Sequence, residues 1–481
     1  LLFISAGIVL STSLGMRKIS LVLACLSITG HGRRSRSSIN QKLSVCLEDN
    51  TRHDFIEGTD DSLAALATLL LRPSPTAAFT PVTVDRTSLP RPVLNEKVEA
   101  LARRYFSLGN KVKQQLGPTG AADLERELAP DFEFVAPLVG PLDRKAIIAA
   151  TTGLDLGQGL PDFDARYHDF RADPDDPNRV WCTMRVKGTH TGVLKFGGIT
   201  AEPKTPPTVV ESPPEAVSLR FDPDTGKLRE LTTGYPLDRR AGSTGGLGGL
   251  FGILEGLGYP LPVPLTRPVG AALAPLLQPL GFALPTAEQD SASPRPTAAA
   301  DERLDDEQLL QLAEGLLAAD FGAADASLLA DLFEFSGPVV GPLRKSGFLA
   351  TWRSLRIAEG LPDIQWNYRD VSIDPYDVNR VWYTSAPTGT HTATLRLGDK
   401  EYAATGRKWI SPPERGSMTF DGSGKCISLT GGYIMDRRMG NTEGFGGVYG
   451  LCAALGLPTP KPAWALRTPA QNWARLTGGQ R

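Results

Sequence analysis

The sequence predicts an α+β protein made of two tandem domains. An internal repeat is the first reason: residues 173–191 read DPDDPNRVWCTMRVKGTHT, and residues 374–392 read DPYDVNRVWYTSAPTGTHT, 201 positions later. The whole repeat spans roughly 170 residues, which is the size of a domain and exceeds a solenoid unit of about 20–50 residues. The order of patterns is the second reason, because in each copy apolar residues at helical spacing come first and strand-like segments follow.

Each copy opens with helical patterns. In residues 93–108 and again in residues 305–319, apolar side chains recur three or four positions apart, which predicts a helix with one buried face. We expect a short second helix at residues 121–128 of the first copy and at residues 324–329 of the second.

A short strand comes next, in which a glutamate stands between two phenylalanines: Phe132-Glu133-Phe134 and Phe333-Glu334-Phe335. A Gly-Pro pair closes this strand in both copies. Residues 143–153 and 344–355 then predict a further helix, which ends at a Leu-Pro-Asp turn.

The rest of each copy reads as extended segments joined by turns. They lie at residues 163–171, 179–196, 208–212 and 217–233, with counterparts at residues 364–373, 380–398, 401–410 and 416–432. Their β-branched and aromatic residues, and the Asp-Pro and Asn turn residues between them, favour antiparallel strands.

The repeat also predicts the organisation of the chain. It comprises a targeting or disordered head at residues 1–80, a first domain at 93–267, a linker rich in Pro and Ala at 268–300, a second domain at 301–465 and a tail at 466–481. Linkers of this composition are at most partly ordered.

The head has features of a targeting segment. The chain begins with Leu rather than Met, and the three apolar runs of the head are shorter than the about 18–20 residues of a membrane-spanning helix. A basic start, an apolar core and an Arg/Ser-rich stretch resemble a signal peptide followed by a transit peptide. Ala77-Ala78-Phe79 is similar to the cleavage motif of plastid proteins in algae with secondary plastids. We therefore expect import into such a plastid, with a secreted or a cytoplasmic protein as the alternatives.

Composition and charge exclude several classes of partner and site. Hydrophobic residues make up 41% of the chain and charged residues 22%, which is ordinary for globular domains. The formal net charge of −2, without a basic stripe, predicts no nucleic-acid partner. The five cysteines share no position between the copies and show no close ligand spacing, so we expect neither a metal site nor a disulfide framework.

Two histidines are the first catalytic candidates. His190 and His391 occupy equivalent positions in a Gly-Thr-His-Thr sequence at the end of a strand. A neutral imidazole that faces a pocket can take a proton from carbon or polarise a carbonyl. The alternative is a structural histidine that bonds the adjacent turn.

Glu133 and Glu334 are the second pair of catalytic candidates. Period-two alternation places each glutamate on the face opposite its two phenylalanines, so a glutamate outside a phenylalanine core is one reading. In the other reading the glutamate faces the interior, where burial would raise its pKa and make it a usable base.

Aromatic pairs are candidates for lining a ligand pocket. Trp181 and Trp382, together with Tyr167 and Tyr368, recur in both copies and suit a flat apolar ligand. Strand aromatics also serve simply as core residues, which is the competing interpretation.

An Asp-Arg-Arg sequence follows the last strand of each copy. Arg239 and Arg240, and their counterparts Arg437 and Arg438, can bind an anionic ligand through bidentate contacts. An intramolecular ion pair, or a cap at the end of the strand, is the alternative role.

A glycine-rich apolar stretch comes after Asp-Arg-Arg in each copy. It lacks the glycine spacing of a dinucleotide fingerprint and the Gly-Lys-Ser/Thr of a phosphate loop. Gly248 and Gly252, like Gly446 and Gly450, are spaced so that a helix can pack closely against another surface. We expect packing within the chain, with a junction between copies or a partner surface as alternatives.

The recurring features together resemble the SnoaL-like polyketide cyclases of the nuclear transport factor two-like superfamily. The resemblance rests on the Phe-Glu-Phe strand, the Leu-Pro-Asp turn, the strand ending in Gly-Thr-His-Thr and a final strand preceded by a Gly-Lys turn. Residues 404–407 are similar to the family's Thr-Gly-Lys/Arg hairpin, whereas residues 204–207 of the first copy depart from it. The resemblance implies a cone, in which a curved antiparallel sheet wraps around the N-terminal helices and leaves an apolar pocket at the open end.

These observations leave two functional hypotheses. In the first, each domain binds an apolar small molecule, and the protein is a cofactor-independent isomerase, cyclase or dehydratase acting on a carbonyl compound. In the second, it is a non-catalytic ligand-binding or assembly module that uses the sheet face or the glycine-rich stretch. In both, the two domains associate as a pseudo-dimer within the chain or as a homo-oligomer.

Overall fold

The computed structural model gives the arrangement of both copies. It describes residues 96–114, 118–137, 139–152, 156–196, 199–259, 295–338, 340–398 and 400–457. The predicted head, the predicted tail and most of the predicted linker lie outside these residues. None of the helices in this part of the chain is long and apolar enough to cross a membrane. We call residues 96–259 the first copy and residues 295–457 the second copy; both belong to one compact unit.

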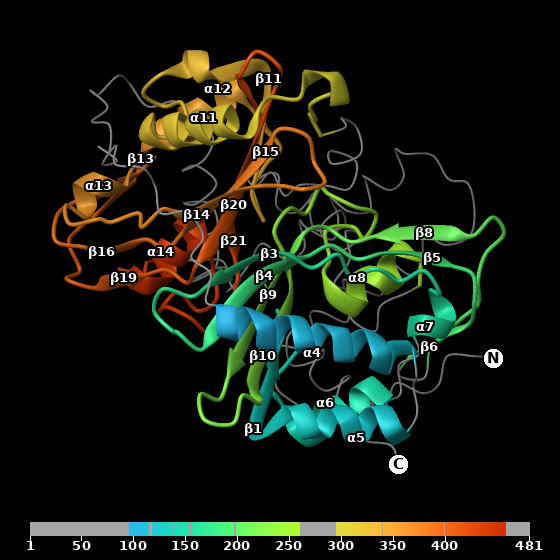
Figure 1. The fold of residues 1–481 in the computed structure, drawn as a ribbon. Helices are drawn as coiled ribbons and strands as arrows, with labels where there is room; N and C mark the ends of the chain where they lie inside the picture. Colours follow the sequence, from blue (N-terminus) through green and yellow to red (C-terminus); the bar gives the residue numbers. More distant parts are fainter. Residues whose placement is uncertain are drawn as a thin grey trace, which may run out of the picture. The chain divides into compact units, whose positions relative to one another are not determined.

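The first copy begins with helices and ends with strands and one further helix (Figure 1). In chain order it contains α4 (Glu96–Gln114), α5 (Pro118–Glu127), β1 (Leu128–Val135), β2 (Leu142–Asp143), α6 (Arg144–Thr152), α7 (Leu156–Gly159), β3 (His168–Ala172), β4 (Arg179–Met184), β5 (Lys187–His190), β6 (Leu194–Phe196), β7 (Ile199–Ala201), β8 (Thr208–Glu211), β9 (Glu215–Phe221), β10 (Leu228–Pro236) and α8 (Gly249–Gly256).

The second copy repeats this order with small changes. It contains η3 (Ala300–Glu302), α11 (Asp306–Ala318), η4 (Ala326–Leu328), β11 (Leu329–Ser336), β12 (Leu343–Arg344), α12 (Lys345–Ser354), β13 (Leu355–Arg356), α13 (Ile357–Gly360), β14 (Arg369–Ile373), β15 (Arg380–Ser385), β16 (Thr388–Thr390), β17 (Leu395–Leu397), β18 (Lys400–Tyr402), β19 (Lys408–Ile410), β20 (Glu414–Phe420), β21 (Cys426–Ile434) and α14 (Gly447–Leu455). Helix α11 begins where Asp305 accepts a hydrogen bond from the amide of Gln308 at 2.9 Å, as an N-cap residue does.

Each copy forms its own six-stranded sheet, and the strand order is the same in both. It runs β2-β1-β10-β9-β4-β3 in the first copy and β12-β11-β21-β20-β15-β14 in the second. The predicted α+β class and the two tandem sheets are therefore confirmed. The prediction of a wholly antiparallel sheet is wrong in one respect, because β1 pairs with β10, and β11 with β21, in parallel. Nearly the whole copy separates these two strands, so no hairpin turn forces them to be antiparallel.

The second predicted helix exists in one copy only. In the first copy it is α5, whereas the second copy has the short turn η4 in its place. From the buried Ala102 of the first helix to Leu128 of β1 is 26 positions, and from the equivalent Ala313 to Leu329 is only 16. The second copy therefore has too few residues to build the extra helix.

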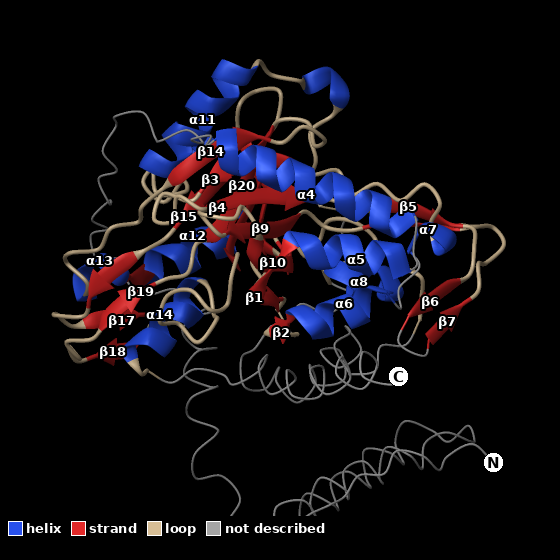
Figure 2. Ribbon diagram, turned by 60° about the horizontal axis from the view of Figure 1, so that its bottom comes forward, coloured by secondary structure: helices blue, strands red, loops and turns tan. Residues whose placement is uncertain are grey.

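The two sides of each sheet have different partners. On β4, Val180 and Cys182 pack into the core of the first copy, on the side that α4 and α6 cover. Trp181 lies between them in sequence and points to the opposite side, as alternation along a strand requires. We call the first side the interior and the second the copy-facing side, because it packs against the other copy. Figure 2 shows α5 and α6 beside β1, whereas α4 lies against β3 and β4.

A bent hairpin extends each sheet beyond its six strands. In the first copy β5 pairs with β8, and β6 and β7 form the far end of the hairpin (Figure 2). In the second copy β16 pairs with β19, and β17 with β18. The glycine-rich stretches form α8 and α14, which contact the hairpin and the last strand of their own copy. They therefore pack within the chain.

The copy-facing sides meet in one hydrophobic cluster. Its buried members are Trp181, Ala216, Tyr235 and Leu237 of the first copy, and Trp382, Tyr433 and Met435 of the second. Burial of apolar side chains from both copies in a single cluster stabilises their contact.

Candidate functional site

The Asp-Arg-Arg sequences reach across from one copy to the other. Arg239 donates from Nε to the Gly337 carbonyl and from Nη2 to the Gly341 carbonyl, both at 2.8 Å. Arg437 makes the two equivalent bonds to carbonyl groups of the first copy, at 3.0 and 2.7 Å. These guanidinium groups therefore bind backbone acceptors of the neighbouring copy, whereas the alternative considered for them was an ion pair or a cap at the end of the strand.

The second arginine of each sequence binds a predicted glutamate. Arg240 pairs with Glu334, whose side chain is only 1% exposed, and Arg438 pairs with Glu133 at 2.7 Å. Both glutamates lie on the copy-facing side, opposite the phenylalanines that flank them. Glu133 is exposed, as the first reading predicted, whereas Glu334 is buried. Their catalytic role stays a prediction, and the structure gives each of them an arginine from the other copy.

The predicted tryptophans also lie at the contact between copies. Trp181 donates its indole N–H to Asp173, and Trp382 to Asp374, each at 2.7 Å. The guanidinium of Arg380 lies over the Trp382 ring, 4.2 Å from its centre. The tryptophan pair therefore faces away from the interior of each copy.

The predicted histidines lie in the hairpin extensions. His190 and His391 are 1% and 0% exposed. Burial lowers the pKa of both imidazoles, and nearby backbone groups only partly offset this effect. Nδ1 of His391 is hydrogen-bonded to the Thr405 hydroxyl at 3.0 Å and accepts the Thr405 amide at 3.3 Å. This histidine bonds the adjacent turn, so the structural alternative describes its surroundings, and its acid–base role stays a prediction.

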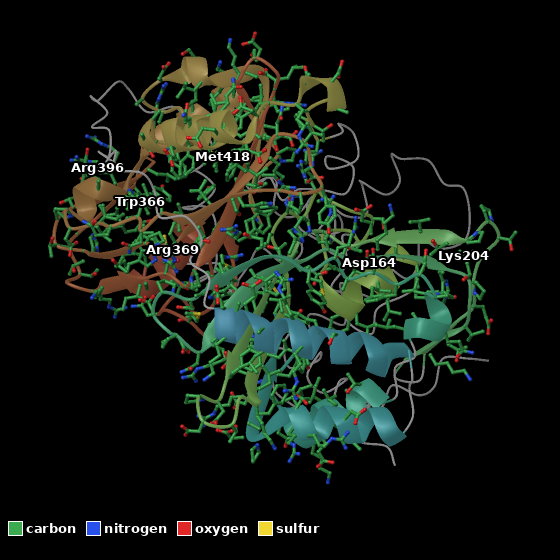
Figure 3. The ribbon with its side chains drawn as sticks, viewed as in Figure 1. Asp164, Lys204, Trp366, Arg369, Arg396 and Met418 are labelled. Atoms are coloured by element: carbon green, nitrogen blue, oxygen red, sulfur yellow. The ribbon has the colours of Figure 1, made fainter. Side chains whose placement is uncertain are left out.

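Residues 204–207 of the first copy, which depart from the family's hairpin sequence, contact the end of helix α8. Lys204, labelled in Figure 3, donates from Nζ to the carbonyl of Leu257 at 2.7 Å. Leu257 is the C-cap of α8, so the lysine satisfies a free carbonyl and places a positive charge at the helix C-terminus.

The predicted tyrosines lie in the interior. Tyr167 stacks on Phe106 of α4 with ring centres 3.7 Å apart. Tyr368 contacts Phe321 and Tyr383 edge-on, at 6.0 Å in each case. Burial raises the pKa of both phenols well above its ordinary value, so their hydroxyls stay protonated.

The interior of each copy also contains a buried glutamate that was not among the predicted site residues. Glu215 begins β9 and Glu414 begins β20, and they are 0% and 5% exposed. Alternation places them on the same side as Val217 and Met418, which belong to the two cores; Met418 is labelled in Figure 3.

The first residues of the glycine-rich helices bind these glutamates. The amide of Gly249 donates to Oε2 of Glu215, and the amide of Gly447 to Oε1 of Glu414, both at 2.8 Å. A helix N-terminus favours a carboxylate at this place. The preceding Gly248 has no room for a side chain, because a Cβ there would overlap with the Gly234 carbonyl. The glycine-rich sequence is thus needed to bring the helix end close to the strand.

Burial dominates the electrostatics of both glutamates. It raises the pKa of Glu215 to about 7, against a smaller lowering by the Gly249 amide. Burial also raises the pKa of Glu414, which in addition accepts the Ser411 hydroxyl at 2.7 Å. Among the ion pairs of the described residues none involves either glutamate. Burial therefore favours the protonated form of each carboxyl group, compared with an exposed glutamate.

Each glutamate is close to tyrosines of the same interior. The charge of Glu215 contributes to the raised pKa of Tyr167, and that of Glu414 to the raised pKa of Tyr368 and Tyr383, although burial is the larger cause. Each copy thus has a buried carboxyl group and tyrosines on the same side of its sheet. This is the candidate site. No group of three or more potential metal ligands is present in the described part of the chain.

The sequence does contain a signal for Glu215 and Glu414. Ser-Pro-Pro-Glu recurs at residues 212–215 and 411–414, immediately before the strand. A carboxylate at the start of a strand is usually exposed, so the repeat alone gave no reason to expect burial. The helix end that binds it comes from 34 positions further along the chain in the first copy and 33 in the second.

Comparison with known proteins yields similarities among solved structures. No family model matches the chain, and no curated protein matches it. A protein described as a SnoaL-like polyketide cyclase from Jannaschia sp. CCS1 is 17% identical, with a TM-score of 0.21, over 26% of this chain and 84% of its own.

Two proteins from Pseudomonas aeruginosa are also similar. A steroid delta-isomerase is 17% identical, with a TM-score of 0.19, over 38% of this chain and 97% of its own. A phenazine biosynthesis-related protein is 16% identical, with a TM-score of 0.20, over 34% of this chain and 92% of its own. The first of these three structures has the SnoaL-like description that the sequence resembles.

Proposed function

We propose that each copy binds an apolar carbonyl compound in its interior and moves a proton there, as a cofactor-independent isomerase, cyclase or dehydratase. The supporting observation is the buried carboxyl group of Glu215 and its counterpart Glu414, each in the same interior as a buried tyrosine whose pKa its charge helps to raise. The interior tyrosines Tyr167 and Tyr368 line the ligand site in this proposal.

The environment of the glutamates suits proton transfer near neutral pH. A general base works best when its pKa lies near the working pH, and burial brings the pKa of Glu215 to about 7. In the reaction the carboxylate takes a proton from the carbon next to the carbonyl, and the C–H electrons form the enolate double bond. The protonated glutamate then returns the proton to a different carbon, which balances the reaction without a co-reactant. Protonated phenols can donate hydrogen bonds to the enolate oxygen.

The test uses 3-cyclohexenone as the probe, because its conversion to the conjugated 2-cyclohexenone is followed by ultraviolet absorbance. The full chain is expected to accelerate this conversion. Replacing both carboxyl groups, E215Q with E414Q, is expected to lower the rate by about 100-fold or more, as loss of a general base does. The exposed Glu401→Gln variant is the control and keeps the wild-type rate.

Companion variants compare the other predicted catalytic residues. H190Q with H391Q tests the proton-shuttle role predicted from the sequence, and E133Q with E334Q tests the predicted glutamates. If the rate falls in the H190Q/H391Q variant and is unchanged in the E215Q/E414Q variant, the general base is a histidine of the hairpin and not a glutamate of the interior. The absence of any acceleration by the wild-type chain contradicts the enzymatic proposal and leaves the ligand-binding or assembly alternative.

We also propose that the two copies form a pseudo-dimer within one chain. The reciprocal bonds of Arg239 and Arg437, and the shared cluster around Trp181 and Trp382, support this arrangement. Light scattering on the purified protein is expected to give the mass of one chain. Twice that mass would favour the homo-oligomer instead.

A further inference from the structure

One edge of the contact between the copies contains a histidine. His168 begins β3, which is the last strand of its sheet, and its ring meets the ring of Tyr376 at 78° with centres 5.1 Å apart. Tyr376 belongs to the second copy, on residues 374–379, which we call the β14–β15 loop. The contact therefore joins an edge strand of one copy to a loop of the other.

Two arginines of the first copy lie beside the same tyrosine. The guanidinium carbons of Arg166 and Arg185 are 4.9 and 6.0 Å from the centre of the Tyr376 ring. Arg185 also donates a hydrogen bond to Asp377 of the loop at 2.9 Å. Cations are attracted to an aromatic ring at these distances, so the arginines hold the loop against the first copy.

The hydrogen bond of His168 defines which nitrogen has the proton. Nδ1 lies 2.7 Å from the carbonyl oxygen of Arg166, and a carbonyl only accepts, so Nδ1 is the donor. Nε2 is buried and has no hydrogen-bond partner among the described residues. A proton on Nε2 would create a buried N–H without an acceptor and a third positive charge beside the Tyr376 ring. The closed contact therefore suits a neutral imidazole.

The acidic groups around His168 already bind other donors. Asp169 accepts from Arg415 and Asp374 from Trp382, each at 2.7 Å. The remaining acidic groups are bound by the two arginines that flank the tyrosine, through ion pairs or through a backbone amide: Asp164, Glu211 and Asp377. None of these five carboxyl groups is hydrogen-bonded to Nε2. A charged imidazole would thus have no counter-ion bonded to it.

The electrostatics of this contact agree with the geometry. Burial has the largest effect on the pKa of His168 and lowers it, and nearby backbone and acidic groups offset this only in part. Burial raises the pKa of Tyr376, so its phenol stays protonated. Burial also acts to raise the pKa of Asp377, but Arg380 and other arginines hold it well below its ordinary value. Histidine is the side chain whose ordinary pKa, about 6.5, lies between pH 5 and 8.

The contact is made once in the molecule. The positions of Arg166, His168 and Arg185 are occupied in the second copy by Asn367, Arg369 and Ala386, and Asp175 replaces the loop tyrosine in the first copy. Figure 3 labels Arg369.

The reciprocal bonds of the Asp-Arg-Arg sequences lie elsewhere. Arg437 binds carbonyl groups next to β1, and β1 is near the opposite edge of the sheet from β3. Release of the β14–β15 loop would therefore free one edge of the contact and leave the other edge bonded.

We propose that His168 is a pH-sensitive switch, whose protonation releases the β14–β15 loop from the first copy while the Asp-Arg-Arg contacts persist. The released state takes up the proton more readily than the closed state. Stability of the closed contact is therefore complete above about pH 6.5 and is lost as the pH falls towards the lowered pKa of His168. This direction is opposite to that of the interior glutamates, whose protonated forms are favoured by burial. The switch concerns the contact between copies and is independent of the proposed function.

The test measures exposure of the Tyr376 ring by fluorine NMR on the full chain labelled with 3-fluorotyrosine. Tyr376→Phe assigns the signal, and the shift between H2O and D2O reports its exposure to solvent. Between pH 7.5 and pH 5.0 the wild-type ring is expected to become more exposed. Uptake of one proton can raise the ratio of released to closed molecules by at most roughly 30-fold over this range.

Two variants remove the titrating group. His168→Gln keeps a neutral donor for the Arg166 carbonyl, and His168→Phe keeps an uncharged ring beside Tyr376; in both, exposure is expected to be the same at the two pH values. His190→Gln is the matched control, because it removes a buried histidine of the β5–β8 hairpin, and it keeps the wild-type response.

Three outcomes would overturn the switch. The first is a wild-type ring whose exposure does not change with pH, and the second is an equal change in the H168Q and H168F variants. The third is a signal that moves with pH in the wild type while its solvent shift stays constant, since this would mean protonation without release.

Discussion

The two sides of the sheets differ in how alike the two copies are. On the copy-facing side both copies share a tryptophan bonded to an aspartate, a tyrosine bonded to an arginine amide, and an Asp-Arg-Arg sequence that crosses over. One buried arginine differs in place: it is Arg171 in the first copy and Arg415, at the position of Ala216, in the second. In the interior, Cys182 beside Val217 is replaced by Tyr383 beside Gly416. Contact between the copies restricts the first side, because a change there must suit both copies. The interior of each copy forms its own hydrophobic cluster, so it can change independently of the other copy.

The largest expected effect comes from breaking the charge network on the copy-facing side. Asp238 pairs with Arg380 at 2.8 Å, and both side chains are 0% exposed. Burial alone would raise the pKa of Asp238, but Arg295 and Arg380 together hold it below its ordinary value. Asp238→Ala is expected to lower the free energy of unfolding by about 3–5 kcal/mol, since it leaves buried cations unpaired. Denaturant unfolding measures this loss.

The equivalent Asp436→Ala variant sharpens the comparison. Arg179 is 3.9 Å away from Asp436, and burial raises the pKa of this carboxyl group. The Asp436→Ala substitution is therefore expected to lower the free energy of unfolding by less than Asp238→Ala does. Equal losses would contradict a stronger pairing of Asp238 with Arg380 and with Arg295, a residue that the sequence assigned to the linker.

A smaller effect is expected from the pH dependence of the interior glutamates. The pKa of Glu215 rises from an ordinary value of about 4.3 to about 7 on folding, so the folded chain binds more protons than the unfolded chain between these values. Stability contributed by the protonated form is therefore complete below about pH 4 and declines as pH rises through 7. Relative to Glu215→Gln, the wild type is expected to lose about 3 kcal/mol between pH 4 and pH 8.

Unfolding curves at several pH values measure this difference. Glu414→Gln is expected to act in the same direction, because burial also raises the pKa of Glu414. If the difference between wild type and variant does not depend on pH, the glutamates are not buried as carboxyl groups. If only one copy responds, the two interiors differ in hydration as well as in packing.

The smallest effect is expected from the exchanged pair of the interior. Gly416→Val places a side chain against the Tyr383 ring and the Thr430 carbonyl, and overpacking of this kind costs about 1–3 kcal/mol. Adding Tyr383→Cys restores the combination found in the first copy and is expected to recover part of the loss. Thermal unfolding of the two single variants and the double variant gives the interaction free energy between positions 383 and 416. Additive losses would mean that the two positions do not compensate for each other.

The repeat and its periodicities were sufficient to predict the fold class, the order of the elements and the helices α4, α11, α6 and α12. They could not identify the interior side, because β4 and β15 are buried at all six positions. A strand buried on both sides shows no alternation of polar and apolar residues. Trp181 and Tyr167 were for this reason assigned to one pocket, although they lie on opposite sides of the sheet.

The candidate site was harder to predict for a related reason. Glu215 and Glu414 become unusual only when the glycine-rich helix covers them, and that contact joins segments far apart in the sequence. The predicted glutamates Glu133 and Glu334 were placed on the correct side by alternation, but their arginine partners belong to the other copy. Periodicity describes neighbours along one chain segment, and it contains no information on such distant partners.

The reciprocal reach of the Asp-Arg-Arg sequences has a consequence for synthesis of the protein. The carbonyl groups next to β1 receive their arginine only from residue 437, although they are made about three hundred residues earlier. While the ribosome translates the second half, the first domain has an uncovered tryptophan and tyrosine, and Asp238 lacks its partners Arg295 and Arg380. We therefore expect the N-terminal half to complete its contacts only after the C-terminal half has been made. A prematurely terminated chain is expected to be a substrate for chaperones rather than an active half of the molecule.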